Sequence, residues 1–547
     1  MMGQSEKNNV ISFLHRHLKN NPQKTVFYYP KIAKNQNGEM LHESIALLEL
    51  VGKTSRLAQS LIELGLKPGD RVLIFLPMGL ELYLAMFAVL QVGAVAVFLD
   101  SWARREQLGL VAKSTEPALM ISIEPAFALA QAIPELDQIP GKIVAGSKSP
   151  LAQYELETLM HNPVQAGIEP VEFGTPALIT FTTGSSGTPK GANRTHGFLA
   201  SQHAALDQCL PYQADDLDLP VFPIFSLNNL AGGVTTILPA IDLAAPSPQD
   251  AERLVQQIQT LKATCCTLSP SLFIQLSEYC REQGIKLASL RRAVTGGAPV
   301  GRENLENFKT IAPRAEILVL YGSTEVEPIA HIEVEELLRG TSREEGVNVG
   351  KISPELEYKF IKIVKGNVEL DSQGWQAIEQ KKGLPGELLV SGAHVCPGYY
   401  RNQEAMKAVK ITGPEGRLWH RTGDVGFLDQ NDDLWIVGRV HNAICRTGEY
   451  LFPIKAELLL KQLDFVKQAA FLGRPDQILK EKTSVVISLK DRSTTQSEIA
   501  YREKILNLMK EHRIPVDEII FREEIPMDPR HHSKVEYTKL REMLDLS

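Results

Sequence analysis

The sequence predicts an α/β fold built on a mostly parallel sheet that helices cover on both faces. Short apolar, β-branched runs alternate with longer amphipathic segments, and Gly, Pro and Asn residues separate them. Such alternation is typical of parallel sheets, whose strands are joined by helical crossovers. The length of 547 residues exceeds the usual size of one hydrophobic core and predicts two or more domains.

Composition indicates a globular protein, with 44% hydrophobic and 22% charged residues. A net charge of −7 offers no broad basic surface for nucleic acid, although a local basic channel stays open. The six cysteines form no CxxC pair and no zinc-ligand spacing, which predicts reduced thiols. The polar start MMGQSEKNNV lacks the apolar core of a signal peptide, so we expect a cytoplasmic protein.

The run from Leu82 to Leu99 is almost entirely apolar and raises the question of a membrane span. Gln91 and Gly93 interrupt it, and residues 94–99 are small or β-branched like those of a buried strand. We therefore interpret the run as a buried helix, a turn and a strand. The alternative of a membrane-embedded transporter or acyltransferase rests on this run alone.

The other predicted elements follow the same alternation. Helices are expected at 10–18, 44–66, 197–210, 251–262 and 454–463. Strands are expected at 25–29, 71–76, 119–123, 142–145, 177–181, 265–268, 292–295, 316–320 and 466–472, with further β structure at 349–351 and 386–392. The stretch 220–227 fits either a packed strand or the lining of an apolar pocket.

The stretch from Phe181 to His196 has the composition of a loop that wraps phosphates. Its glycines allow successive backbone N–H groups to converge on an anion, and its hydroxyls and lysine add donors. These residues are Thr182, Thr183, Gly184, Ser185, Ser186, Gly187, Thr188, Lys190 and Gly191. A Walker P-loop needs a lysine directly after the last glycine, and that pattern fails here. An ordinary Ser/Gly turn is the other interpretation.

Two later turns carry groups that suit a nucleotide. Tyr321-Gly322-Ser323-Thr324-Glu325 places an aromatic ring, hydroxyls and a carboxylate in succession after a strand. They can serve ring stacking, a phosphate contact and a Mg²⁺ ligand, while the alternative is a core tyrosine and a solvated acid. Asp424 can accept from both ribose hydroxyls, or it is an acid in a surface turn.

These segments together resemble the adenylate-forming superfamily, which includes acyl-CoA synthetases, luciferases and the adenylation domains of peptide synthetases. TTGSSGTPKG matches the signature T-[ST]-G-[ST]-[ST]-G-x-P-K-G, YGSTE matches Y-G-x-T-E, and T-G-D recurs at 422–424. The resemblance spans residues 10–540, with its motifs in the expected order.

The resemblance implies a large N-terminal domain, residues 1–438, made of parallel-sheet α/β subdomains and a β-subdomain. It also implies a small, mobile α+β C-terminal domain, residues 439–547, after a hinge near 439–442. His441 and Asn442 stand where relatives usually carry Asp or Lys and then Asp. Residues 447–453 resemble a loop that lines a thiol-acceptor channel in the thioester-forming relatives.

The resemblance also implies roles for particular residues. Gly297, Ala298 and Pro299 would form the adenine-binding segment, and Tyr321 would stack on the adenine. Thr324 would contact the α-phosphate, and Glu325 with Thr183 would hold Mg²⁺. Asp424 and Arg439 would bind the ribose or phosphates. Lys190 would neutralise phosphate charge, and Lys534 would bridge the carboxylate and the α-phosphate, with Ser533 in place of the usual glycine. The adjacent His531 and His532 lack other ligands at metal spacing and are expected in a solvated loop.

The implied reaction is activation of a carboxylic acid, expected to be a fatty acid, by ATP to an acyl adenylate. Transfer to coenzyme A ranks first as the second step. A β-lactone synthetase of the olefin pathway, in which the substrate's own hydroxyl displaces AMP, ranks second. A nucleotide-binding regulator without activity predicts loss of Lys534, Glu325 or Asp424, and the sequence has all three. Chain length and oligomeric state stay open.

Overall fold

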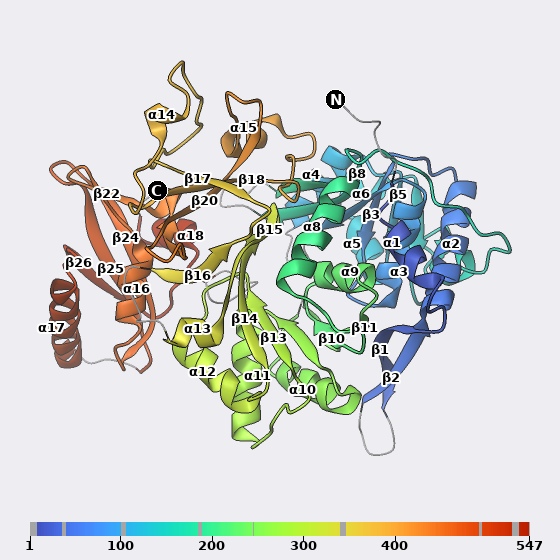
Figure 1. The fold of residues 1–547 in the computed structure, drawn as a ribbon, viewed down its shortest axis with the longest axis horizontal. Coiled ribbons are helices and arrows are strands. Elements are labelled where there is room, and N and C mark those ends of the chain that lie inside the picture. Colours follow the sequence, from blue (N-terminus) through green and yellow to red (C-terminus); the bar gives the residue numbers. More distant parts are fainter. Residues whose placement is uncertain are drawn as a thin grey trace. The chain divides into compact units, whose positions relative to one another are not determined.

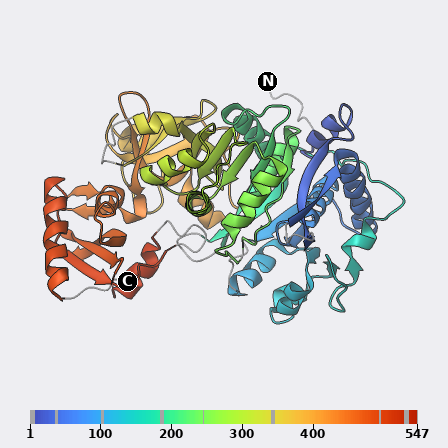
Figure 2. The same ribbon diagram turned by 90° about the horizontal axis from the view of Figure 1, so that it is seen from below.

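The computed structural model describes residues 8–34, 40–99, 105–183, 189–243, 245–339, 346–491, 495–527 and 535–545 (Figures 1 and 2). The chain forms two compact units. The first falls within residues 1–329 and 392–406, and the second within 330–391 and 407–547.

The first sheet of unit one has the strand order β7-β6-β5-β3-β4-β8-β9. All neighbours pair parallel except β8 and β9, which form an antiparallel hairpin. The strands are β3 (Arg71–Phe75), β4 (Val95–Leu99), β5 (Leu119–Ser122), β6 (Gly141–Val144), β7 (Tyr154–Glu155), β8 (Pro176–Thr183) and β9 (Pro189–Thr195). The surrounding helices are α1 (Ser12–Leu18), α2 (Leu47–Glu63), α3 (Leu80–Gln91), α4 (Arg105–Thr115), α5 (Glu124–Ala130), α6 (Pro134–Asp137) and α7 (Leu156–Leu159).

Side chains of this sheet alternate between two hydrophobic clusters, as strand geometry requires. Val72 and Ile74 of β3 join the cluster of α1, α2 and α3, whereas Leu73 joins the cluster of α4 and α5. The predicted α/β class, with a parallel sheet covered on both faces, is therefore confirmed.

The apolar run 82–99 forms α3 and β4, as predicted. Every residue from Leu80 to Gln91 is buried except the half-buried Glu81, which explains why the helix is apolar around most of its circumference. Gln91 is satisfied internally, because its Nε2 donates to Ser55 Oγ (3.1 Å) and to the carbonyl of Ala166 (2.8 Å). Within the described ranges, no helix combines the length and apolar character that a bilayer-spanning segment requires.

The second sheet of unit one runs in the order β15-β14-β13-β12-β10-β11-β1-β2. Its strands are β1 (Thr25–Lys34), β2 (Met40–Ala46), β10 (Leu217–Pro220), β11 (Thr235–Ile237), β12 (Cys265–Leu268), β13 (Arg292–Gly296), β14 (Glu316–Ser323) and β15 (Val326–Glu333). Its helices are α8 (His196–Cys209), α9 (Pro223–Ala231), α10 (Asp250–Leu261), α11 (Pro270–Glu282) and α12 (Arg302–Ile311). Figure 1 shows α10, α11 and α12 on the opposite side of β13 and β14 from α8 and α9.

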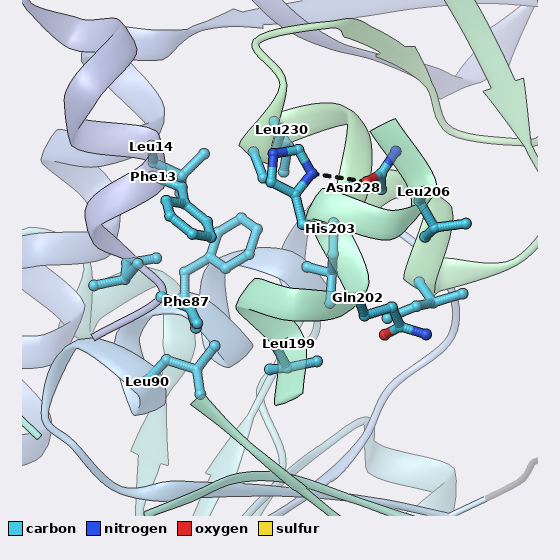
Figure 3. Close-up of a pocket in the computed structure, with 15 residues that line it drawn as sticks. Phe13, Leu14, Phe87, Leu90, Leu199, Gln202, His203, Leu206, Asn228 and Leu230 are labelled. Atoms are coloured by element: carbon cyan, nitrogen blue, oxygen red, sulfur yellow. Dashed lines mark hydrogen bonds between the residues drawn. The ribbon is translucent and has the colours of Figure 1, made fainter. Parts of the chain in front are cut away.

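The structure decides between the two interpretations of residues 220–227 and shortens one predicted helix. The packed strand is wrong, because β10 ends at Pro220 and α9 begins at Pro223, where proline is tolerated at the first helical position. Ile224 and Leu227 line an apolar cavity (Figure 3), as the other interpretation predicted. The expected helix 44–66 begins only at Leu47, since Ser44 to Ala46 pair antiparallel with β1 as the end of β2.

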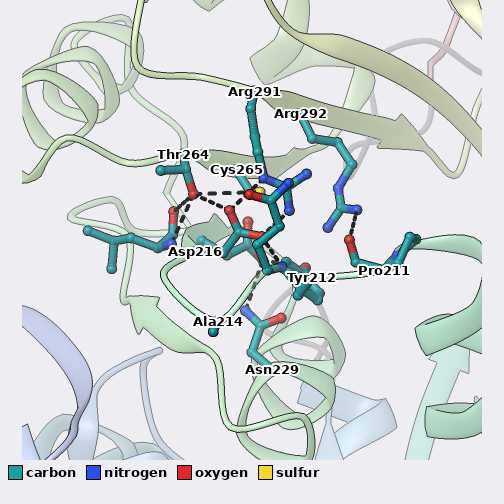
Figure 4. Close-up of polar contacts among 12 residues, drawn as sticks. Pro211, Tyr212, Ala214, Asp216, Asn229, Thr264, Cys265, Arg291 and Arg292 are labelled. Carbon is teal, nitrogen blue, oxygen red and sulfur yellow. Dashed lines mark hydrogen bonds and ion pairs between the residues drawn. The ribbon is translucent and has the colours of Figure 1, made fainter.

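A polar network ties together the amino ends of β10, β12 and β13 (Figure 4). Asp216 accepts hydrogen bonds from Arg291 Nε (2.6 Å) and Thr264 Oγ1 (2.7 Å). Deeper in the sheet, the fully buried Asp218 accepts from Tyr212 Oη and Asn229 Nδ2, both at 2.8 Å. Ligands of α/β proteins collect at the opposite, carboxyl ends of parallel strands. These charges therefore stabilise the sheet rather than form a site.

Unit two contains an antiparallel sheet in the order β17-β18-β20-β21-β16 and a smaller sheet, β24-β25-β26. The first part comprises α13 (Val334–Arg339), β16 (Val347–Ile352), β17 (Glu357–Ile361), α14 (Trp375–Ile378), β18 (Gly386–Ser391), β19 (Lys410–Thr412), β20 (Leu418–Leu428), β21 (Leu434–Arg439) and η1 (Val440–Asn442). The second part comprises β22 (Ile444–Arg446), β23 (Glu449–Leu451), α16 (Pro453–Leu460), β24 (Val466–Asp476), β25 (Lys480–Leu489), α17 (Thr495–Glu511), β26 (Glu518–Arg522) and α18 (Tyr537–Met543). β15, which continues past Ile329, and α15 (Gln403–Val409) belong partly to each unit.

The smaller sheet is covered on both faces. Ala469 and Phe471 of β24 pack with α16 and α17, while Ala470 and Leu472 pack with α18. Figures 1 and 2 both show α17 lying alongside the sheet.

Glu457 on α16 makes the stability of this part depend on pH. Its carboxylate accepts hydrogen bonds from Tyr537 Oη and Phe471 N, and burial raises its pKa to about 7. The folded state thus keeps a proton that the unfolded state releases above the ordinary pKa of 4.5. We expect the Glu457 contribution to the free energy of unfolding to fall by about 1–3 kcal/mol between pH 4.5 and 7.

Denaturant unfolding of the wild type and Glu457→Gln at pH 5 and pH 7.5 checks this expectation. Glu457→Gln should lose part of the pH dependence, whereas Glu503→Gln, at an exposed position of α17, should keep it. Equal pH dependence in the wild type and Glu457→Gln would contradict the raised pKa.

Candidate active site

The glycine-rich stretch connects the two strands of the β8–β9 hairpin. Thr182 lies opposite Lys190 in the register, and Thr183 is the last residue of β8. Lys190 is a partly buried strand residue. Residues 184–188 lie outside the described residues, so the phosphate-binding roles of Gly184, Ser185, Ser186, Gly187 and Thr188 stay predictions.

Gly191 is required by the packing of this hairpin. A Cβ at Gly191 would lie 2.8 Å from side-chain atoms of both Ile179 and Phe181. The distant segment 398–400 runs along β9, where Tyr400 N donates to the carbonyl of Gly191 (2.8 Å). The β8–β9 hairpin and segment 398–400 are therefore held together by backbone hydrogen bonds.

The turn after β14 is shorter than the sequence indicated. β14 continues to Ser323, so Tyr321, Gly322 and Ser323 are strand residues and only Thr324 and Glu325 form the turn into β15. The expectation that all five residues form one tight turn was wrong, because the strand pairing continues past Leu320.

Two residues that the sequence did not single out hold this turn. Tyr399 Oη donates to Glu325 Oε1 (2.7 Å), and Arg194 Nη2 on β9 donates to the carbonyl of Thr324 (3.0 Å). Both side chains are buried. The contacts bring β9, the β14–β15 turn and segment 398–400 together, and they fix the Glu325 carboxylate through one of its oxygens.

Arg194 also faces a second acid. Burial raises the pKa of Glu327 on β15 to about 7, and the positive charge of Arg194 opposes that rise. Burial in turn lowers the pKa of the Arg194 guanidinium. In the sequence, Arg194 lies within the predicted phosphate-loop stretch 181–196 and Tyr399 is one of two adjacent tyrosines, but neither pattern reveals its partner.

The carboxyl ends of β13 and β14 lie side by side, with Gly296 opposite Leu320. A Cβ at Gly296 would collide with the carbonyl oxygen of Leu320, and Gly297 has a φ of +87°. The predicted adenine segment, Gly297 to Pro299, therefore leaves the sheet next to Tyr321, which is half-buried. Bare backbone beside an aromatic ring can receive a flat base.

In unit two, Asp424 on β20 lies opposite Arg439 on β21. Arg439 Nε lies 2.8 Å from Asp424 Oδ1, and Asp424 is buried while the Arg439 side chain is half exposed. Gly423 has a φ of +70°, and Asp424 N donates to Thr422 Oγ1 (3.0 Å), which shapes the turn-like bend at the T-G-D motif. The Asp424 carboxylate is therefore held in place, and the partly exposed guanidinium of Arg439 lies next to it.

The structure thus brings Tyr321, Thr324, Glu325 and the Gly297 segment together at the adjacent carboxyl ends of β13 and β14 in unit one. Lys190 lies in the β8–β9 hairpin, and its contact with this group stays a prediction. In unit two, Asp424 is paired with Arg439. Lys534, Ser533, His531 and His532 lie outside the described residues, and their roles stay predictions. Among the described residues, no group of three or more His, Cys, Asp or Glu side chains could hold a metal ion.

Comparison with known proteins identifies the family to which the chain belongs. Residues 14–400 match the family described as AMP-binding enzyme, and the chain belongs to that family. It is an adenylate-forming ligase that uses ATP to activate an acid.

Among its relatives, it is 27% identical over 509 residues to the olefin beta-lactone synthetase of Stenotrophomonas maltophilia, covering 90% of each chain. It is 24% identical to the mitochondrial medium-chain acyl-CoA ligase ACSF2 of Mus musculus, covering 92% of this chain and 84% of that one. The ATP-bound structure of MatB from Rhodopseudomonas palustris superimposes with a TM-score of 0.77 at 20% identity, covering 98% and 99% of the two chains.

Proposed function

We propose that this enzyme activates a fatty acid with ATP and then transfers the acyl group to coenzyme A. The observation that carries the choice of acid is an apolar cluster beside the nucleotide-binding turns. Leu206, Phe225 and Ile224 of α8 and α9 pack there with Val294 of β13 and Leu320 of β14. An apolar wall next to the reacting centre suits an alkyl chain.

In the first step, a carboxylate oxygen attacks the α-phosphorus of ATP, and the bond from that phosphorus to the bridging oxygen breaks. Pyrophosphate leaves and an acyl adenylate remains. In the second step, the sulfur of coenzyme A attacks the acyl carbon, AMP departs and the thiol proton is lost to water. Because positioning and charge neutralisation dominate such transfers, little covalent chemistry is needed from the protein.

The proposed roles follow the geometry. Lys190 and Lys534 would offset charge that develops on the α-phosphate, and Tyr321 would stack on adenine. Asp424 would accept hydrogen bonds from the ribose hydroxyls, and Arg439 would bind the ribose or the phosphates beside it. Each of these groups would act without changing its own covalent bonds.

The donor chemistry at Glu325 fits Mg²⁺, because this ion binds proteins through one or two carboxylates together with substrate phosphates. Tyr399 occupies one carboxylate oxygen and leaves the other able to serve as a ligand. Glu325, with Thr183, would hold Mg²⁺, which when bound would neutralise phosphate charge.

We propose the boundary between a large and a small domain at 438/439, with the hinge at 439–442. The chain there forms η1, in which His441 is exposed and Asn442 is buried. The β22–β23 hairpin beyond it turns at Thr447 and Gly448, both with positive φ, and we propose that it lines the entry of coenzyme A.

A β-lactone synthetase is the second candidate. The observation in its favour is the relative of that name, which aligns with 90% of this chain. In this alternative the 3-hydroxyl of a 2-alkyl-3-hydroxy acid attacks its own acyl carbon and expels AMP. The first half-reaction is the same.

A product mass spectrum distinguishes the candidates. Purified protein would be incubated with ATP, Mg²⁺ and coenzyme A, and given either a long-chain fatty acid or a 2-alkyl-3-hydroxy acid. An acyl-CoA from the fatty acid is the expected result. A product lighter than the hydroxy acid by one water, formed without coenzyme A, would establish the lactone synthetase instead. If neither acid leads to release of AMP, the protein would instead be a nucleotide-binding regulator without activity.

A further inference from the structure

The two sheets of unit one supply different parts of the candidate active site. The β8–β9 hairpin, which carries the predicted phosphate loop, belongs to the first sheet. The β14–β15 turn, which carries Thr324 and Glu325, belongs to the second sheet. Reaction at a phosphorus centre depends on how the surrounding protein groups are placed, and a displacement of about 1 Å can cost about 100-fold in rate. The hairpin and the turn must therefore be held in a fixed relation to each other.

Arg194 on β9 makes a direct contact between the hairpin and the turn. Its Nη2 donates to the backbone carbonyl of Thr324 (3.0 Å). Arg194 is only 6% exposed, and its guanidinium lies 5.8 Å from the ring centroid of Phe198 on α8. A planar guanidinium that is buried and packed against a ring has few other positions available. The arginine can therefore fix the position of the turn against β9.

Residues 396–400 join the same hairpin and turn through the backbone. Asn193 N on β9 donates to the carbonyl of Gly398 (2.9 Å), and Cys396 N donates to the carbonyl of Glu325 (2.7 Å). This segment thus holds the second residue of the turn, while the arginine side chain holds the first. The two contacts act on adjacent peptide groups, so together they define the orientation of the turn.

The positive charge of Arg194 lies beside two acidic side chains. Glu327 on β15 has the stronger electrostatic interaction with the guanidinium, and Glu325 in the turn has a weaker one. Because a buried charge without a partner is costly, Glu327 suits the role of counter-charge to the arginine. The three groups together carry one net negative charge, which suits a divalent cation that is shared with substrate phosphates.

We infer that Arg194 is a positioning residue for adenylate formation, which holds the Thr324–Glu325 turn in place against the β8–β9 hairpin, and that Glu327 is its counter-charge. In this role Arg194 touches neither ATP nor the acid and acts through the turn. The inference rests on the proposed function for the roles of Thr324 and Glu325. It predicts that loss of the arginine affects adenylate formation separately from its effect on stability.

The test measures acid-dependent exchange of labelled pyrophosphate into ATP, with dodecanoate and, in parallel, a 2-alkyl-3-hydroxy acid. The free energy of unfolding is measured on the same variants. Arg194→Met removes both the donor and the charge, and it should lower the exchange rate at saturating ATP and acid by about 10- to 100-fold. Arg194→Lys keeps the charge and a donor group, so it should recover part of that loss.

A double variant separates positioning from stability. Arg194→Met with Glu327→Gln also removes the unpaired negative charge, so it should regain part of the stability that Arg194→Met loses. Its exchange rate should stay as low as that of Arg194→Met, because the Thr324 carbonyl still lacks the donor from β9. If Arg194→Met does not fold, the double variant gives the rate instead.

Arg292→Met is the matched control. Arg292 on β13 is also buried and also donates to a backbone carbonyl, that of Pro211 (2.8 Å). It begins β13, at the end of the strand away from Gly296 and the nucleotide-binding turns. Arg292→Met should therefore lose stability and keep the exchange rate of the folded enzyme.

The outcomes separate this inference from the proposed function. If the wild type exchanges pyrophosphate and Arg194→Met keeps its rate, or if the double variant recovers rate and stability together, the inference fails. If neither acid supports exchange by the wild type, the proposed function fails, and calorimetric binding of ATP with Mg²⁺ decides the inference. An affinity that Arg194→Met lowers by about tenfold and Arg292→Met retains would support it. Equal affinities in the three proteins, or no binding, would overturn it.

Discussion

Glu325→Gln is expected to lower the rate of acid-dependent AMP formation by about 10²- to 10³-fold, the usual effect of removing one preorganised charge from a transition state. The carboxylate stands on the turn between β14 and β15, and Tyr399 Oη fixes one of its oxygens at 2.7 Å. Glutamine keeps the size and can still accept from Tyr399, so the substitution removes charge more than shape. Release of AMP and pyrophosphate from purified variants at several Mg²⁺ concentrations is the measurement.

Tyr399→Phe is the matched control for this prediction. It keeps the Glu325 charge but removes the hydrogen bond, so we expect a loss of about tenfold at low Mg²⁺. High Mg²⁺ should restore most of that rate, because the carboxylate is still present. A Glu325→Gln enzyme with the wild-type rate, or a Tyr399→Phe enzyme that Mg²⁺ does not rescue, would show that this turn does not hold the metal.

The sequence was sufficient to predict many of the strands, including β13 and β14 before the Glu325 turn, but not β9, β20 and β21. Apolar runs such as Arg71–Phe75 and Cys265–Leu268 are strands because each is short, apolar and followed by a helical period. The α3–β4 segment was also predictable, since Gln91 and Gly93 interrupt the apolar run where the chain must turn. These signals are local in the sequence, and they were enough to predict these strands and helices.

The contacts that position the candidate site were not predictable, because they join distant segments. Arg194 and Thr324 are 130 positions apart, and Tyr399 and Glu325 are 74 apart. No period or motif records such a pair. The stretch 220–227 was ambiguous because its local pattern fits two structures. A short apolar run fits a strand and a buried helix equally well, and tertiary packing decides between them.

Unit two shows the same limit at a buried ion pair. Arg421 and Glu387, on the adjacent strands β20 and β18, have side chains only 6% and 1% exposed. Arg421 Nη2 lies 2.7 Å from Glu387 Oε2, and its Nε donates to Oε1 at 3.0 Å. Burial raises the pKa of the Glu387 carboxyl, and Arg421 opposes that shift. In the sequence, Arg421 stands out only as the residue before the T-G-D motif.

Arg421→Met is expected to lower the free energy of unfolding of unit two by about 3–5 kcal/mol, because it leaves the Glu387 charge buried without its partner. The guanidinium also donates to the carbonyl of Val364 (2.8 Å), which would lose its donor. Tryptophan fluorescence in guanidinium chloride is a suitable measurement, since three of the four tryptophans, Trp375, Trp419 and Trp435, lie in this unit.

The double variant Arg421→Met with Glu387→Leu decides whether the effect comes from the uncompensated charge. Removing both charges eliminates that penalty, so the double variant should be more stable than either single variant. Additive losses would instead assign the effect to packing and to the carbonyl left without a donor. Because Asp424 follows on the same strand, the single variant should also bind ATP more weakly than the double variant does, which connects the fold of β20 to the nucleotide it is predicted to hold.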